Sequence, residues 1–150
     1  MTNDPQALAF LKGNSLGVLS TVAPDGQPRS RTVYYASTDA FEIYFMTLAG
    51  TRKVEDINHE SRAAFVVSDP DAPRTLQIEG VLSAEPDTAL IDPIVKQLMD
   101  NFMKKGPDFA PLTHLDPTTI LFYKLTPTWV RLGNFKQAED TDEAFTEVTP

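Results

Sequence analysis

Hydroxyl and cationic side chains gather at the start of one predicted helix. Residues 45–57 read FMTLAGTRKVEDI, which begins as a strand and becomes an amphipathic helix from Thr51 onward. The first N–H groups of a helix have no partner within it, and the helix dipole places partial positive charge there. Arg52 and Lys53 are therefore disfavoured at this position unless an anion compensates them. Together with the Thr51 hydroxyl, these groups are the donors of a phosphate site.

A neighbouring predicted strand supplies two more cations. Arg29 and Arg31 are two residues apart, so their side chains lie on one face of that strand. The alternative interpretation is that the cations of the helix are ordinary solvated surface charges. The need for a compensating anion at the helix start favours the phosphate site.

The composition indicates one globular domain of 150 residues. The formal net charge of -8 argues against binding to nucleic acid or to anionic membranes. Cysteine is absent, which removes thiol catalysis, disulfides and Cys-ligated metal sites. No apolar run reaches the ~20 residues that cross a bilayer, and the N-terminus lacks the pattern of a secretory leader. We therefore expect a cytoplasmic protein that binds neither nucleic acid nor membrane.

Residues for acid–base or metal chemistry are sparse. His59 and His114 are 55 residues apart and form no metal-binding motif, so no metal site is expected. Phosphate-binding P-loops, dinucleotide-binding glycine motifs and serine-nucleophile motifs are absent. The sequence therefore identifies no catalytic residue, and a bound cofactor would have to supply any difficult chemistry.

Short strands and tight turns dominate the predicted elements. The turn PDGQP joins two strands into a hairpin, because proline presets φ and glycine accepts positive φ. Strands are expected at residues 15–23, 29–37, 41–47, 61–69 and 75–85, one or two more strands at residues 118–135, and helices at residues 5–13, 51–58 and 87–103. This pattern favours a small antiparallel barrel with peripheral helices. The domain is expected to cover residues 1–136, with a loop at 108–118 and an acidic, mobile tail at 137–150.

Three stretches resemble the pyridoxamine 5'-phosphate oxidase-like, FMN-binding split-barrel superfamily. YFMTLAGTRKVEDI is similar to its strand–loop–helix, GVLSTVAPDGQPRSRTVYY to its first hairpin, and RTLQIEGVLSAEP to a later strand that ends in a glycine before a helix. The similarity extends from about Leu8 to Phe135. It implies a mainly β fold, a six-stranded antiparallel split β-barrel, that forms a homodimer with two FMN sites at the interface.

The same resemblance implies a set of cofactor-binding residues. They are Arg31, Thr32, Val33, Met46, Thr47, Thr51, Arg52, Lys53, Thr75, Gln77, Trp129 and Arg131. Within this set, Arg31 would reach the phosphate, and residues 51–53 would form the phosphate-binding loop. Residues 46 and 47 would border the flavin ring through their backbone, while Trp129 and Arg131 would come from the partner subunit.

Departures from the oxidase pattern concern its substrate. Ala36 stands where the true oxidase has a lysine that closes the first flavin strand. The C-terminal stretch VRLGNFKQ lacks the histidine of the oxidase's Arg-x-His pair, and residues 90–105 contain no match to its Tyr/Arg/Ser cluster. The resemblance therefore predicts the phosphate site for the cofactor and not the one for pyridoxamine phosphate.

The resulting expectation is an FMN-dependent oxidoreductase that acts on an unidentified small molecule. A non-catalytic flavin-binding carrier or redox sensor is an alternative, because it needs the same pocket. A deazaflavin-dependent reductase on the same barrel is another, because such relatives also use a basic groove. A haem-binding relative is a further alternative, although neither His59 nor His114 lies in a haem-ligand motif.

Overall fold

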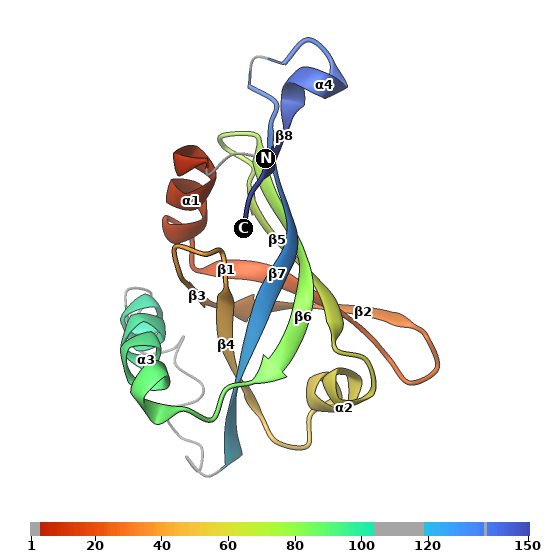
Figure 1. Cartoon of the computed structure of the whole chain (residues 1–150), viewed down its shortest axis with the longest axis vertical. Helices are drawn as coiled ribbons and strands as arrows, with labels where there is room; N and C mark the ends of the chain where they lie inside the picture. The colour runs from red at the N-terminus through yellow and green to blue at the C-terminus, as the bar shows by residue number, and fades with distance from the viewer. Residues whose placement is uncertain (1–3, 104–118, 137) are drawn as a thin grey trace.

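A curled antiparallel sheet with four helices around it forms the protein in a computed structural model (Figure 1), which describes residues 4–103, 119–136 and 138–150. The strands are β1 Leu16–Val22, β2 Pro28–Tyr34, β3 Ala36–Ser37, β4 Ile43–Leu48, β5 Arg62–Asp69, β6 Arg74–Ala84, β7 Ile120–Asn134 and β8 Phe145–Val148. The helices are α1 Pro5–Lys12, α2 Arg52–His59, α3 Thr88–Met103 and α4 Thr141–Ala144. The fold is mainly β, and the split-barrel class expected from the sequence fits it.

The order of strands in the sheet is β2-β1-β5-β6-β7-β4-β3, with β8 paired to β7. The long strand β7 pairs with β6 along one edge; its other edge pairs first with β4 and then with β8. A register shift interrupts the β6–β7 ladder after Glu79, and a Cβ on Gly80 would lie only 2.3 Å from the Thr126 carbonyl oxygen. Such a bulge bends a strand pair, which helps the sheet to curl.

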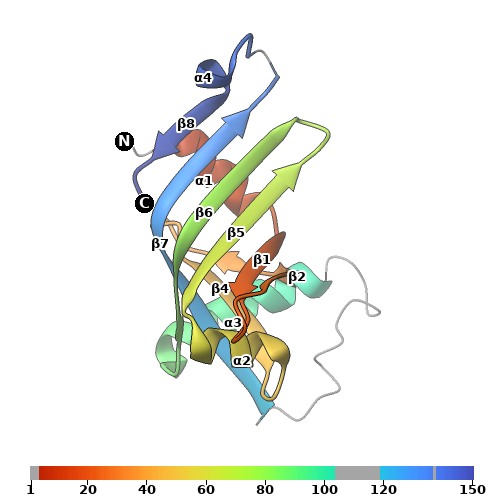
Figure 2. The same cartoon turned by 90° about the vertical axis from the view of Figure 1, so that its right-hand side faces the viewer.

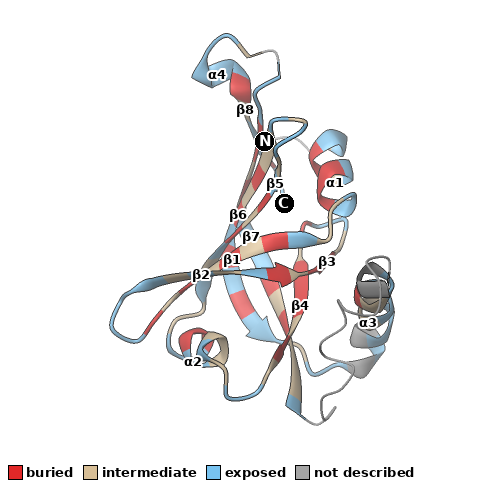
Figure 3. Ribbon diagram, turned by 180° about the vertical axis from the view of Figure 1, so that it is seen from behind, coloured by how far each residue is buried: buried red, intermediate tan, exposed pale blue. Residues whose placement is uncertain are grey.

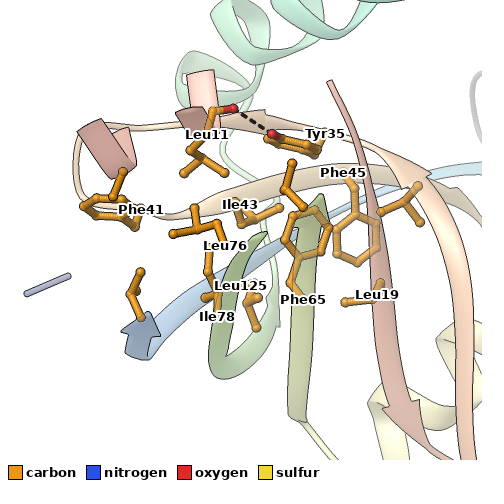
Figure 4. Close-up of a cluster of buried hydrophobic side chains, with 14 of the residues drawn as sticks. Leu11, Leu19, Tyr35, Phe41, Ile43, Phe45, Phe65, Leu76, Ile78 and Leu125 are labelled. Carbon is orange, nitrogen blue, oxygen red and sulfur yellow. Dashed lines mark hydrogen bonds between the residues drawn. The ribbon is translucent and has the colours of Figure 1, made fainter. Parts of the chain in front are cut away.

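Alternation along the strands separates the core from the outer face. Leu19, Phe65, Ile78 and Leu125 are almost completely buried and belong to one apolar cluster (Figure 4). The Tyr35 hydroxyl donates a hydrogen bond of 2.6 Å to the carbonyl oxygen of Leu11, which ties α1 to the sheet. The first helix begins as predicted, because the Asp4 carboxylate accepts from the N–H groups of Gln6 and Ala7.

The helices cover the sheet unequally. α1 contributes Ala7, Phe10 and Leu11 to the core, whereas α3 packs Leu98 against Ala36 and its neighbours. On the face of β5, β6 and β7 that points away from α1, the structure has none of the described helices (Figure 2). Figure 3 shows the result, since buried and more exposed residues alternate along these strands. This outer face carries several of the predicted cofactor-binding residues.

Two expectations about the sheet were wrong in detail. The structure has eight strands instead of six, because β3 is a separate two-residue strand and β8 forms within the predicted tail. The tail was expected to be mobile, but Ala144 and Val148 are buried and β8 pairs with β7 from Val130 to Gly133. The low apolar content gave no signal of this strand, which is held by its backbone pairing with β7 and by the packing of Phe145 against Phe135.

The remaining predicted elements agree with the structure or lie outside it. The hairpin, the helix at residues 51–58 and the long helix ending near Met103 are confirmed as β1–β2, α2 and α3. The predicted loop at residues 108–118 lies outside the described residues. No helix in the described part of the chain is both long and apolar enough to cross a membrane.

Candidate functional site: an anion pocket at the start of a helix

The start of α2 offers backbone N–H groups that no side chain caps. Gly50 has a positive φ of 79°, which allows the chain to turn from β4 into the helix. Thr51 occupies the N-cap position, but its hydroxyl donates to the carbonyl oxygen of Leu48 at 3.0 Å and makes no cap hydrogen bond. The first N–H groups of α2 are therefore available to an anion.

Lys53 reaches back across this helix start. Its Nζ donates to the Thr47 hydroxyl at 3.2 Å, and the hydroxyls of Thr47 and Thr51 are 3.4 Å apart. Burial lowers the pKa of Lys53, and the nearby positive charge of Arg31 lowers it further. Among the described residues, no ion pair includes Lys53 or Arg52. The site therefore holds positive charge that a bound anion would stabilise.

Arg29 and Arg31 are fixed by a carboxylate on the same helix. Asp56 is completely buried, and its two oxygens accept from Arg29 at 2.8 Å and from Arg31 at 3.3 Å. The Thr21 hydroxyl donates to Asp56 at 2.8 Å and accepts from Arg31 at 2.6 Å. These contacts join α2 to the β1–β2 hairpin and hold both guanidinium groups beside the helix start.

These groups line one pocket of about 610 Å³ between β2 and α2. Its lining residues are Arg29, Ser30, Arg31, Thr51, Arg52 and Lys53. Four cations thus face a single space, with the buried Asp56 carboxylate behind two of them. The donor set fits a phosphate group, which can accept hydrogen bonds from guanidinium, ammonium, hydroxyl and backbone N–H groups at once.

A second group of predicted site residues lies on the outer face of β6 and β7. Arg131 donates to the Gln77 side-chain oxygen at 2.9 Å, and its guanidinium lies 5.1 Å from the Trp129 ring centre and 4.1 Å from that of Phe145. The Trp129 Nε1 donates to Glu147 of β8 at 3.3 Å. A shallow pocket of about 310 Å³ beside this group is lined mainly by β1, β5 and β6 and includes Gln77 and Trp129.

Thr75 and Thr32 belong to the same outer face. The Thr75 hydroxyl is 3.4 Å from that of Ser68, and Thr75 precedes Gln77 by one strand period. Thr32 pairs with Val18, which pairs in turn with Val66. Because side chains alternate along β2, Thr32 lies on the face opposite to Arg31.

The structure therefore divides the predicted site into two groups. Thr47, which accepts a hydrogen bond from Lys53 of the anion pocket, pairs with Leu121 of β7, whereas Trp129 and Arg131 lie eight and ten residues further along that strand. At about 3.3 Å per residue, this is roughly 26 to 33 Å along β7. No hydrogen bond among the described residues joins the two groups. Arg31, Thr47, Thr51, Arg52 and Lys53 come together; Thr32, Thr75, Gln77, Trp129 and Arg131 form the other group.

Val33 and Met46 belong to neither group through their side chains. Val33 is 6% exposed and lies in the main core. Met46 packs with Ala36 and Leu98 beneath α3. Only their backbone groups remain as candidates for the flavin contacts that the resemblance implied.

Two residues that contact the arginines of the anion pocket had no role in the sequence-based prediction. Asp56 follows Lys53 by three residues and Arg52 by four, a spacing at which helical side chains share a face, and this signal could have identified it. Thr21 gave no local signal, because its contact with Asp56 joins segments 35 residues apart. No cluster of three possible metal ligands occurs among the described residues.

Comparison with known proteins identifies the family of this fold and site. The pyridoxamine 5'-phosphate oxidase family matches the chain over residues 4–133. This match covers most of the 150 residues, so the chain belongs to that family.

Solved structures share the fold at low sequence identity. A conserved hypothetical protein from Mycobacterium tuberculosis superposes with a TM-score of 0.73 at 18% identity, covering 96% of each chain. A heme binding protein from Mycobacterium smegmatis superposes with a TM-score of 0.74 at 17% identity, covering 99% of this chain and 58% of its own. A FAD-binding protein from Mesorhizobium loti superposes with a TM-score of 0.65 at 21% identity, covering 85% of this chain and 91% of its own. These similarities concern the fold alone.

Proposed function

We propose that this protein is an FMN-binding flavoprotein whose anion pocket holds the cofactor phosphate. The observation that carries the proposal is the convergence of Arg31, Lys53 and the uncapped start of α2 on one pocket. Arg52 and Thr51 add further donors to the same space. Membership of the pyridoxamine 5'-phosphate oxidase family supports the assignment.

The electrostatics of Lys53 support a dianionic ligand. In the free protein, burial and the charge of Arg31 both oppose the ammonium form and lower its pKa. A phosphate dianion placed between Lys53 and Arg31 reverses the second effect, because each cation then faces opposite charge. A neutral ligand would offer no such stabilisation.

The flavin ring would be enclosed by a homodimer. Thr32, Gln77 and Trp129 lie on the outer face, apart from the anion pocket of the same chain. A second copy could bring its own outer-face group to the pocket of the first, so that both chains complete each flavin site. The uncovered face of β5–β7, where Val81 is 41% exposed, supports this arrangement. Sedimentation that finds a monomer with full FMN affinity would contradict it.

The activity that fits this site is flavin-dependent oxidoreduction of a small molecule. When bound, FMN supplies the hydride or electron transfer, and the chain's residues need only bind, orient and shield the reactants. Ala36, at the position of the oxidase's lysine, is 1% exposed and packs against Leu98. A lysine side chain at this position would therefore displace α3. This supports a substrate other than pyridoxamine phosphate.

The visible spectrum of the purified protein tests the cofactor. Oxidised flavin, reduced deazaflavin and haem absorb differently, so FMN released on denaturation supports the proposal. Release of deazaflavin or haem, or failure of the protein to bind added FMN, would overturn it. Turnover of NAD(P)H with an electron acceptor would then distinguish an oxidoreductase from a flavin carrier or redox sensor.

A further inference from the structure

A buried carboxylate behind the anion pocket is the feature that phosphate binding alone does not explain. Asp56 has no exposed surface, yet it lies within hydrogen-bonding distance of two arginines that line the pocket. A negative charge so close to a phosphate lowers its affinity by repulsion. Its presence therefore requires a compensating benefit.

The geometry of the two arginines indicates that benefit. Arg29 and Arg31 lie on one face of β2 and carry like charges, so without a carboxylate between them they repel each other. Asp56 accepts from Arg29 through Oδ1 and from Arg31 through Oδ2. Each oxygen therefore fixes one guanidinium, and the other N–H groups can still donate to a ligand.

A hydroxyl completes the arrangement. Thr21 donates to Asp56 Oδ2 and accepts from Arg31 NH1, and its side chain is only 2% exposed. It thereby sets the orientation of both the carboxylate and one guanidinium. Asp56 is on the same helix as Lys53, so the network also fixes α2 relative to β2.

We propose that Asp56 is a positioning residue that preorganises Arg29 and Arg31 for the phosphate of the ligand, with Thr21 as its support. The free-energy cost of holding the two guanidinium groups together is offset during folding, so it does not reduce the free energy of ligand binding. Arg29 thereby becomes a third guanidinium donor of the pocket, beside Arg31 and Arg52. This inference rests on the proposed function for the identity of the ligand, but not for the anion-binding role.

Asp56→Asn gives a test in which positioning and simple electrostatics predict opposite signs. The amide keeps the shape and one acceptor but removes the negative charge, so the pocket becomes more positive. Simple electrostatics then predicts tighter FMN binding. Positioning predicts that the two arginines separate and that the dissociation constant for FMN rises about tenfold, the size expected for a lost charged hydrogen bond. Riboflavin, which lacks the phosphate, should bind as it does to the wild type.

Three further variants keep the test decisive. Asp92→Asn makes the same chemical change at an exposed position of α3 and should leave both affinities unchanged. Thr21→Val keeps the Asp56 charge but removes its support, so FMN should weaken in the same direction by a smaller factor. Thr21→Ser retains the hydroxyl and should bind FMN with the affinity of the wild type. This comparison would still test the network if Asp56→Asn failed to fold.

The outcomes separate this inference from the proposed function. If the wild type binds FMN and Asp56→Asn binds it equally or more tightly, or loses riboflavin to the same extent, Asp56 does not position the arginines for phosphate. If the wild type binds neither flavin, the proposed function fails, and inorganic phosphate followed by phosphorus NMR becomes the probe. Weaker phosphate binding by the variant would then support the inference, whereas equal or absent binding would overturn it.

Discussion

The anion pocket and the outer face of β6–β7 both present arginine side chains, but they are built differently. In the pocket, Arg31 donates partly buried hydrogen bonds to Asp56 and Thr21, which are joined to each other by a buried one. On the outer face, Arg131 has one side-chain acceptor, Gln77, and otherwise packs against aromatic rings. The Arg131 Nε is buried without a hydrogen-bond partner among the described atoms.

Under the proposed function, this difference fits two regions that contact different parts of one ligand. Fixed cations and uncapped N–H groups favour a compact dianion, while an arginine beside an indole ring favours a planar, polarisable surface. A cofactor with a phosphate at one end and an aromatic ring at the other needs both kinds of surface. The following experiments test whether the regions separate in this way.

Lys53→Ala should weaken FMN more than any other single change outside the Asp56 network. A hydrogen bond to a charged group contributes about 1.5–3 kcal/mol, so the dissociation constant should rise by about tenfold or more. Riboflavin should be little affected, because Lys53 acts on the phosphate. Flavin fluorescence quenching during titration measures both affinities.

A matched control for this variant lies on α3. Lys96→Ala removes the same charge and side chain from an exposed position and should change neither affinity. If FMN and riboflavin lose affinity equally in Lys53→Ala, or if neither does, Lys53 is not a phosphate ligand.

Trp129→Ala should affect both ligands alike. If the outer-face group contacts the flavin ring, truncation removes an aromatic contact of about 1 kcal/mol, which corresponds to roughly a fivefold loss for FMN and for riboflavin. The ratio of the two affinities is the internal control, since it should remain that of the wild type. A selective loss of FMN would show that this group also serves the phosphate.

FMN binding should take up protons at pH values between the pKa of Lys53 in the free protein and its pKa in the FMN-bound protein. The pKa of Lys53 is lowered in the free protein, first by burial and then by Arg31. A bound phosphate raises that pKa, so the fraction of neutral Lys53 gains a proton on binding. Calorimetry in two buffers of different ionisation enthalpy measures the uptake, which Lys53→Met should abolish.

Lys53 also makes the stability of the free protein depend on pH, because folding lowers its pKa. The folded state holds the Lys53 proton less tightly than the unfolded state, so it binds fewer protons across the window between the two pKa values. The free energy of unfolding should therefore rise with pH there, by a small amount that Lys53→Met removes. If Lys53→Met takes up as many protons on FMN binding as the wild type does, a group other than Lys53 is responsible for that uptake.

The smallest expected effect is the turnover of pyridoxamine 5'-phosphate. A phosphorylated substrate needs cations beyond those that hold FMN, and the outer-face group offers only Arg131. FMN-loaded protein incubated with this substrate under oxygen should therefore form no pyridoxal phosphate or peroxide. Turnover of ~1 per second or faster would show that the outer face can hold a second phosphate.

Local sequence patterns predicted the elements and the phosphate end of the site. Period-two alternation separated Leu76 and Ile78 from Thr75 and Gln77, and the structure confirms this, because alternation follows directly from strand geometry. The donors at residues 51–53 were equally accessible to prediction, because the start of a helix and its free N–H groups are properties of a few neighbouring residues.

The surroundings of those donors, and the grouping of the predicted residues on shared surfaces, follow from long-range contacts. Asp56 reaches Thr21 across 35 residues of sequence, and Val148 completes the edge of β7 from a segment that reads as a polar tail. Such contacts depend on how strands are ordered and how helices pack on them, which no local pattern specifies. Local sequence alone therefore predicts the donors of the anion pocket, whereas the curling of the sheet places Arg31 and Arg131 in separate regions.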